Sequence, residues 1–183
     1  MTPTEELREE HGIIMRMFAI LQRMGEMMEK RYSHAEKHLE QIMEFLKVFV
    51  DQCHHGKEEE ILFPELENAK LPDEGRMVRE LISEHLAGRE IVEEMGRALE
   101  KRKQQADEAT SEFVEASNRY VKLFRRHIRK ENGMLFPEVN KRLSKDKQVE
   151  ISMGFQNLEH EKIGEGRHEV FHSLIKALEK IGT

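Results

Sequence analysis

Apolar side chains recur at intervals of three and four residues along almost the whole chain, which is the spacing of an amphipathic helix. The pattern predicts four long helices, over residues 4–30, 34–64, 74–104 and 109–137, with connectors at 32–33 and 71–74. Thr4 is expected to cap the first helix, because its side chain can accept a hydrogen bond from a free backbone N–H. Pro64 lacks a backbone donor and is expected to end or kink the second helix.

Residues 143–183 continue the helical pattern beyond the fourth helix. We expect one or two shorter helices there, with a break at residues 164–166 and a last apolar stripe from Val170 to Leu178. No stretch rich in Pro, Gly or Ser separates them from the preceding residues. The sequence therefore predicts an all-α protein in which residues 1–142 form the main domain and residues 143–183 form a C-terminal helical extension packed on it.

The composition favours this fold class and excludes several others. A chain of 183 residues is long enough for one domain, and its bias to Glu, Lys, Arg, Met and Leu favours helices over strands. Hydrophobic residues make up 38% and charged residues 36%, which is too charged for a membrane protein and too apolar for a disordered one. The net charge of -6 disfavours nucleic acid as a partner.

The chain also carries no signal for export. Its first residues are acidic and polar, unlike a signal peptide, and it contains no run of about 20 apolar residues that could span a membrane. Cys53 is the only cysteine, so neither an intrachain disulfide nor a thiolate zinc site can form. We therefore expect a cytoplasmic protein without a membrane partner.

A phrase that carries histidines occurs twice. Residues 54–64 read HHGKEEEILFP and residues 127–137 read HIRKENGMLFP, at a constant offset of 73 residues. The pairs Glu10-His11 and Glu84-His85 stand 74 residues apart. Each half of the chain is therefore a pair of helices, of which the first carries a histidine and the second a His-x-x-x-Glu motif.

This spacing predicts a metal site in the core. Residues four apart lie on one face of a helix, so each motif can direct an imidazole and a carboxylate at one centre. These polar residues fall on the apolar stripes, where unpaired carboxylates would cost several kcal/mol or more to bury. A single histidine on such a stripe is more often a hydrogen-bonded core residue, but the repetition favours two divalent ions. The predicted ligands are His11, His54, Glu58, His85, His127 and Glu131.

The order of these motifs resembles the hemerythrin-like, or HHE cation-binding, family over about residues 5–142. The resemblance implies an up-down four-helix bundle that holds a non-haem di-iron centre. It also implies that the cofactor is two iron ions, with an oxo or hydroxo bridge when oxidised. Glu58 and Glu131 would be the bridging carboxylates, and the four histidines would be terminal ligands.

One departure from the family pattern bears on function. Oxygen-carrying hemerythrins place a fifth histidine four residues after the one on the third helix, and here that position is Arg89. One iron would then have an additional open position, where a small molecule can bind, or would take a substitute ligand. For each candidate substitute a solvated surface position is the alternative. The candidates are His55, Glu59, His160, Glu161, Glu165, His168 and His172.

Other metal and thiol motifs are weaker. The sequence from His168 to His172 matches the zincin pattern H-E-x-x-H, but it is a lone match without a protease scaffold, so peptidase activity is disfavoured and a second metal site is a minor alternative. His34 and His38 fit a charged surface better than a metal site, and Cys53 fits a buried, inert thiol. A ferritin-like centre would need Glu-x-x-His on two helices, and only residues 165–168 fit, so that centre is disfavoured. The first predicted helix begins almost at once, which argues against the iron-sulfur repair branch of the resembled family, whose members usually carry an N-terminal segment with a cysteine.

Three functions are consistent with these residues. The first is a di-iron protein that binds or reduces a small oxidant (O2, H2O2 or NO) as a sensor or detoxifier, with peroxidase-, catalase- or NO-handling activity. The second is reversible binding or storage of O2, and the third is a non-catalytic iron-binding or storage protein. The sequence leaves open whether iron or manganese fills the site, and whether the chain is a monomer or a homodimer.

Overall fold

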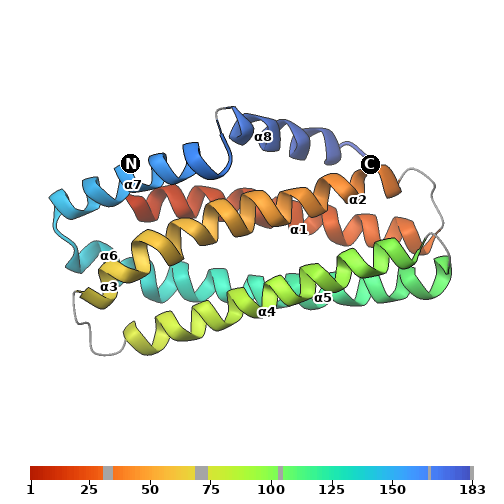
Figure 1. Cartoon of the computed structure of the whole chain (residues 1–183), viewed down its shortest axis with the longest axis horizontal. Coiled ribbons are helices and arrows are strands. Elements are labelled where there is room, and N and C mark those ends of the chain that lie inside the picture. The colour runs from red at the N-terminus through yellow and green to blue at the C-terminus, as the bar shows by residue number, and fades with distance from the viewer. Residues whose placement is uncertain (31–34, 69–73, 103–104, 165, 182–183) are drawn as a thin grey trace.

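The computed structural model describes residues 1–30, 35–68, 74–102, 105–164 and 166–181, and every regular element in these ranges is a helix. Four long helical rods lie side by side, and two C-terminal helices follow one another along one side of them (Figure 1). The first rod is α1 (Pro3–Glu29) and the third is α4 (Glu74–Lys101). The second rod comprises α2 (Ala35–Glu44), η1 (Phe45–His55), η2 (Lys57–Leu62) and α3 (Phe63–Asn68). The fourth comprises α5 (Ala106–Lys130), η3 (Glu131–Leu135) and α6 (Phe136–Arg142), and the C-terminal helices are α7 (Lys145–Lys162) and α8 (Arg167–Leu178). The predicted all-helical bundle with C-terminal helices is confirmed.

The N-terminal cap differs from the prediction. Thr2, not Thr4, caps α1: its Oγ1 accepts the backbone N–H of Glu5, and the Glu5 carboxylate accepts the backbone N–H of Thr2. This reciprocal pair satisfies two backbone donors at once, and Pro3 fits the first turn because it has no N–H to satisfy. Thr4 is buried instead and donates its hydroxyl to Asn140 Oδ1 at 2.7 Å, which ties α1 to α6.

The second rod runs past Pro64, which was expected to end or kink the helix, and the fourth runs past Pro137, where the predicted helix ended. The rods continue to Asn68 and Arg142, because Pro64 and Pro137 fall in the first turns of α3 and α6, where a missing N–H costs little. The third rod ends at Lys101, and Gln104 lies outside the described residues. Residues 32–33 and 71–73 of the predicted connectors lie outside the described residues as well, and Glu74, the last residue of the second connector, begins α4.

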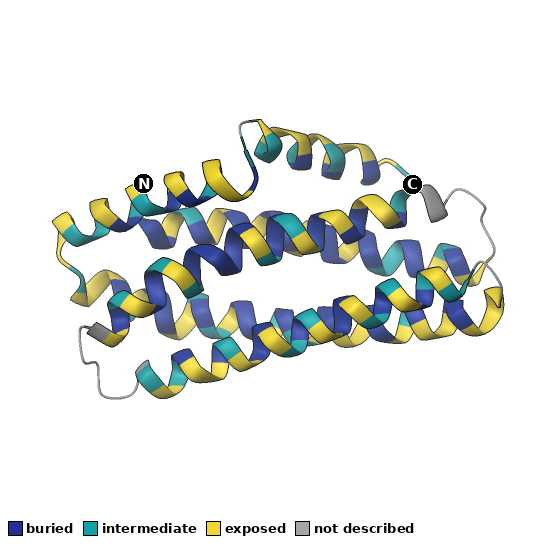
Figure 2. Ribbon diagram, in the orientation of Figure 1, coloured by how far each residue is buried: buried dark blue, intermediate teal, exposed yellow. Residues whose placement is uncertain are grey.

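Buried side chains form two apolar clusters with a polar layer between them. Figure 2 shows the buried residues on the inner faces of the rods and the exposed residues outside. Along α1 one cluster ends at Leu7 and the other begins at Ile13, and along α4 the corresponding residues are Leu81 and Ile91. The Glu-His pairs at residues 10–11 and 84–85 lie in these intervals, and the His-x-x-x-Glu motifs of the second and fourth rods face them. The bundle therefore holds its polar groups in one layer that is closed on both sides by apolar packing.

The C-terminal helices contribute to both clusters. Ile151 and Phe155 of α7 join the cluster that contains Leu7, and Phe171 and Ile175 of α8 join the other. Both helices pack on α1 and on the second rod, so that this half of the bundle has a cover (Figure 1). None of the described helices combines the length and apolar character that a membrane span requires.

Candidate metal centre

Both histidine motifs lie where the helix widens. His54 is the next-to-last residue of η1, Glu58 is in η2 and Glu131 begins η3, and all three segments are π-helical, with i→i+5 hydrogen bonds. The sequence prediction assumed α-helical spacing through both motifs, so the structure corrects it. π-helical turns are rare and occur mostly at functional sites. In the second rod the six consecutive residues 53–58 are all buried, because α1, α4, α5 and α7 surround this segment.

The structure brings the six predicted ligands together in one buried layer. None of their side chains is more than 2% exposed. Their ligand atoms form two groups of four, and within each group the atoms lie within 4.8 Å of one another. One group contains His11 and His54 and the other contains His85 and His127, whereas Glu58 and Glu131 belong to both. This arrangement suits two metal ions that share two carboxylates.

Each shared carboxylate directs one oxygen to each half of the bundle. Glu131 Oε2 lies 3.1 Å from His11 Nε2, and its Oε1 lies 3.1 Å from His127 Nε2. Glu58 Oε1 lies 3.9 Å from His54 Nε2, and its Oε2 lies 3.5 Å from His85 Nε2. All four histidines therefore point Nε2 inward.

His85 Nε2 and His127 Nε2 lie within hydrogen-bond distance of each other, 3.0 Å apart, but most of the inner atoms have no hydrogen-bond partner in the protein. All four oxygens of Glu58 and Glu131, together with His11 Nε2, are buried without a hydrogen-bond partner. A buried polar atom without a partner costs about 1–3 kcal/mol, and more when it is charged. Carboxylate oxygens and imidazole nitrogens are ligands that divalent transition metals accept, so this donor set fits a pair of such ions.

A second layer of residues fixes the four rings through Nδ1. His54 Nδ1 donates to Glu10 at 2.7 Å and His127 Nδ1 donates to Glu84 at 3.0 Å. His85 Nδ1 donates to Glu59 at 2.7 Å, and His11 Nδ1 donates to Asn132 at 3.1 Å. Such bonds set the tautomer and orientation of a metal-ligating histidine. These partners were not predicted from sequence, although they repeat at the same offsets of 73 and 74 residues as the ligands do.

The charges of the centre are strongly coupled. Burial and the negative charge of Glu131 hold the pKa of Glu58 well above its usual range. Burial also lowers the pKa of His54, to about 4. For His127 burial acts in the same direction, but Glu131 and Glu84 overcome it and raise the pKa to about 9. Binding of metal ions through His127 Nε2 would therefore release a proton from this histidine near neutral pH.

Comparison with known proteins identifies the domain. The model of the hemerythrin HHE cation binding domain matches residues 2–139. The chain belongs to this family. Over 181 residues it is 23% identical to the uncharacterized proteins Rv1995 of Mycobacterium tuberculosis and Mb2018 of Mycobacterium bovis, which covers 98% of this chain and 70% of each relative. The similarity to these relatives thus includes α7 and α8, which lie beyond the HHE domain.

Arg89 points away from the centre of this HHE domain. Its guanidinium donates to Asp51 at 2.7 Å and to Glu59 at 2.8 Å, and its side chain is 33% exposed. Glu59 in turn holds His85 Nδ1. Glu59, one of the candidate substitute ligands, is therefore already bound to a histidine of the centre. Arg89 offers no metal-binding atom to the buried layer.

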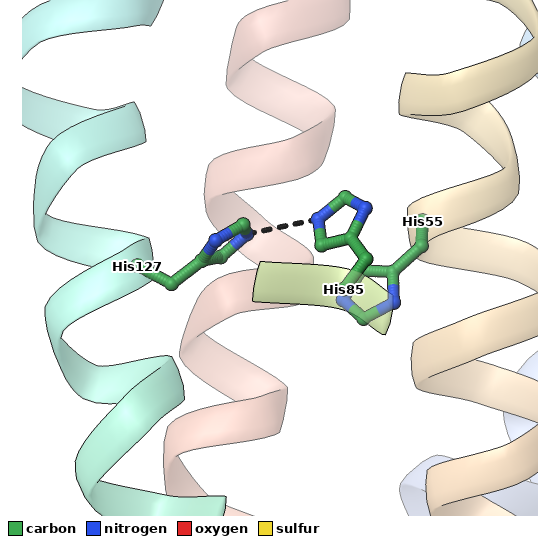
Figure 3. A group of neighbouring side chains, drawn as sticks. All are labelled: His55, His85 and His127. Carbon is green, nitrogen blue, oxygen red and sulfur yellow. Dashed lines mark hydrogen bonds between the residues drawn. The ribbon is translucent and has the colours of Figure 1, made fainter. Parts of the chain in front are cut away.

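His55 is buried beside the centre, so the alternative of a solvated position is wrong for this residue. Figure 3 shows His55, His85 and His127 together, and the ring of His55 stacks on that of His85 with centroids 3.8 Å apart and an angle of 14° between the rings. An imidazole binds a metal in its own plane, so an ion in the plane of His85 is out of line with the parallel ring of His55. As the rings stand, both cannot ligate one ion. Phe124 packs on His55 as well, with centroids 5.2 Å apart.

The candidates in the C-terminal extension do not reach the two central groups. His160 and Glu161 are exposed, and Glu165 lies outside the described residues. His168 and His172 are half-buried neighbours with ring centroids 5.0 Å apart, and His168 also lies near Glu10 and Glu159.

Two further residues from the sequence analysis can be placed. Cys53 is fully buried, and burial raises the pKa of its thiol to about 12, which makes it unreactive as predicted. His38 is paired with Gln41, and His34 lies outside the described residues.

Proposed function

We propose that this HHE protein is a non-haem di-iron protein that binds or reduces a small oxidant, O2, H2O2 or NO, as a sensor or detoxifier. The observation that carries the proposal is the set of four buried carboxylate oxygens of Glu58 and Glu131, which lack hydrogen bonds and face one histidine each. Two iron ions bound there would supply the electrons and the coordination position that such a reaction needs.

The residues of the chain divide the work. Glu58 and Glu131 would bridge the ions, and His11, His54, His85 and His127 would each close one position. Glu10, Glu59, Glu84 and Asn132 hold the rings so that Nε2 points inward. The apolar clusters on both sides of the layer keep bulk water away, which strengthens every electrostatic interaction within it.

The oxidant is proposed to enter on the side of His85. There the cover consists of three charged side chains, Asp51, Glu59 and Arg89, each between a quarter and a third exposed. Neither Arg89 nor His55 adds a donor to this position in the present arrangement. An uncommitted coordination position beside a partly open surface is what a small exogenous ligand requires.

The test is anaerobic loading of the metal-free protein with Fe(II), followed by an iron count and visible spectra before O2, after O2 and after deoxygenation. Two irons per chain that oxidise irreversibly, together with turnover of H2O2 or NO faster than free iron achieves, would support the proposal. A spectrum that returns to its starting form would indicate reversible O2 binding instead. Two irons without any reaction would leave iron binding or storage as the function, and fewer than two irons would contradict the di-iron centre.

A further inference from the structure

Lys57 is a fully buried cation that lies close to the proposed metal centre but is not part of its ligand set. Its ammonium donates to three carboxylates: Glu10 at 2.5 Å, Glu6 at 2.7 Å and Glu159 at 3.0 Å. Glu6 and Glu10 come from α1, whereas Glu159 comes from α7. Because a buried charge must be compensated, these contacts fix the position of the ammonium.

A continuous chain of polar contacts leads from α7 to a proposed ligand. Glu10 binds Lys57 through Oε1 and receives the Nδ1–H of His54 at Oε2, 2.7 Å away. The sequence of contacts is therefore Glu159, Lys57, Glu10, His54. Each member is held by charge-assisted hydrogen bonds, which are about twice as strong as neutral ones.

The other half of the bundle contains an equivalent lysine–glutamate–histidine chain, but no carboxylate from α7 takes part in it. Lys130 donates to Glu84 at 2.8 Å and to Glu80, and Glu84 receives the Nδ1–H of His127. Lys130 is 22% exposed, however, whereas Lys57 is 0% exposed. Water therefore screens the charge of Lys130, whereas the charge of Lys57 acts in a less polar environment.

α7 packs closely on the second rod, and this packing holds Glu159 beside Lys57. A Cβ atom at Gly154 would lie 3.3 Å from Ile61, and one at Gly56 would lie 3.5 Å from Leu158. Phe155 lies between them along α7, and its ring centroid is 5.8 Å from the Lys57 ammonium. The helix thus contacts the second rod through small and apolar residues on both sides of Lys57.

We infer that Glu159 of α7 is a positioning residue for His54, acting through Lys57 and Glu10, and that the C-terminal extension thereby makes the two metal positions unequal in affinity. Glu159 neutralises part of the positive charge of Lys57, so Lys57 withdraws less negative charge from Glu10. A Glu10 with more negative charge makes His54 a stronger metal ligand. The metal part of this inference rests on the proposed di-iron centre. The contact chain itself belongs to the metal-free protein and can be tested there.

The first test is NMR of the imidazole N–H groups in the metal-free protein. Glu159→Gln keeps an oxygen near Lys57 but removes the charge, so the low-field Nδ1–H resonance of His54 should shift while that of His127 stays in place. Glu161→Gln is the matched control, because it removes an exposed charge from the same helix. If the His54 resonance is unchanged in Glu159→Gln, or moves equally in Glu161→Gln, the inference is wrong.

The second test is titration of the metal-free variants with Co(II), followed through its visible absorption. Direct partners of ligating histidines change metal affinity by about 10–100-fold when mutated, so Glu159→Gln, two contacts further out, should weaken one of two binding steps by no more than about ten-fold. The other step should change less than about two-fold. Equal weakening of both steps would overturn the inference, whereas a wild-type protein that binds fewer than two Co(II) would overturn the di-iron proposal and this metal step with it.

A double-mutant cycle separates the contact chain from a general effect on packing. In a Lys57→Met background, Glu159→Gln should change the affinity less than about two-fold, because the connecting charge is gone. In a Lys130→Met background it should keep its full effect. Additive effects of Lys57→Met and Glu159→Gln would show that Glu159 does not act through Lys57.

Discussion

The two halves of the bundle hold the same polar residues in different surroundings. In both, a glutamate of the first helix binds the histidine of the second, and a lysine three residues after that histidine neutralises the glutamate. In the first half α7 covers this arrangement, and in the second half it reaches the surface. The inner layer therefore follows the internal repeat, whereas its electrostatic environment depends on what packs outside it.

A second difference concerns the two remaining histidines. His85 is held by a carboxylate, Glu59, whereas His11 is held by the amide of Asn132 at the equivalent place. A carboxylate makes an imidazole more basic than an amide does. The two proposed metal positions thus differ on two counts, which are the exposure of the lysine behind one histidine and the charge of the group that holds the other histidine.

The largest effect should come from the residues that both halves share. Glu58→Gln and Glu131→Gln should each abolish binding of both ions, because each carboxylate directs one oxygen to each group. Glu60→Gln is the control, since Glu60 is exposed and pairs only with Lys162 among the contacts described. Metal content per chain measures the result. A variant of either shared carboxylate that retained two ions at wild-type affinity would show that this residue does not bridge.

Next in size is the effect of removing the carboxylate that holds one histidine in each half. Glu10→Gln and Glu84→Gln should each weaken metal binding by about 10–100-fold. Glu10 should give the larger loss, because its cation Lys57 is fully buried, whereas the cations that pair with Glu84, Arg126 and Lys130, are 60% and 22% exposed. Titration with Fe(II) under anaerobic conditions at low and high salt measures both. Equal losses with equal salt dependence would remove the distinction between the covered and the open half.

The sequence predicts the inner layer well because ligand spacing and repetition are local properties. Six residues that fall on apolar stripes at offsets of 73 and 74 are enough to locate the layer, even though the helix there is π and not α. Glu10 and Glu84 could have been assigned from the same offsets. Lys57 could not, because its contacts with Glu159 and Phe155 depend on the packing of α7 on the second rod, which no sequence pattern predicts. The stacking of His55 on His85 also depends on tertiary packing.

Gly88 tests how tightly the open half is packed around His55. A Cβ atom there would lie 2.4 Å from the ring of Phe124, which packs on His55, so Gly88→Ala should lower the free energy of unfolding by about 1–3 kcal/mol. Gly96→Ala is a matched control on the same helix, because nothing lies within 4 Å of its added Cβ. It should raise stability by about 0.5–1 kcal/mol. Urea unfolding of the metal-free protein measures both, and a neutral Gly88→Ala would mean that Phe124 can move away from His55.

The smallest effect on stability, and the most informative on function, is expected from Arg89→His. The ion pairs of Arg89 with Asp51 and Glu59 are partly exposed, so their loss should cost no more than about 1 kcal/mol of unfolding free energy. The substitution places an imidazole one turn from His85 and leaves Glu59 free of the guanidinium. If the lack of a metal ligand at position 89 sets the reactivity with O2, the iron-loaded Arg89→His variant should return to its starting spectrum after deoxygenation more completely than the wild type does. Arg89→Gln, which removes the same ion pairs without adding a metal-binding nitrogen, should not. Identical behaviour of the two variants would assign the effect to the lost ion pairs and not to the added ligand.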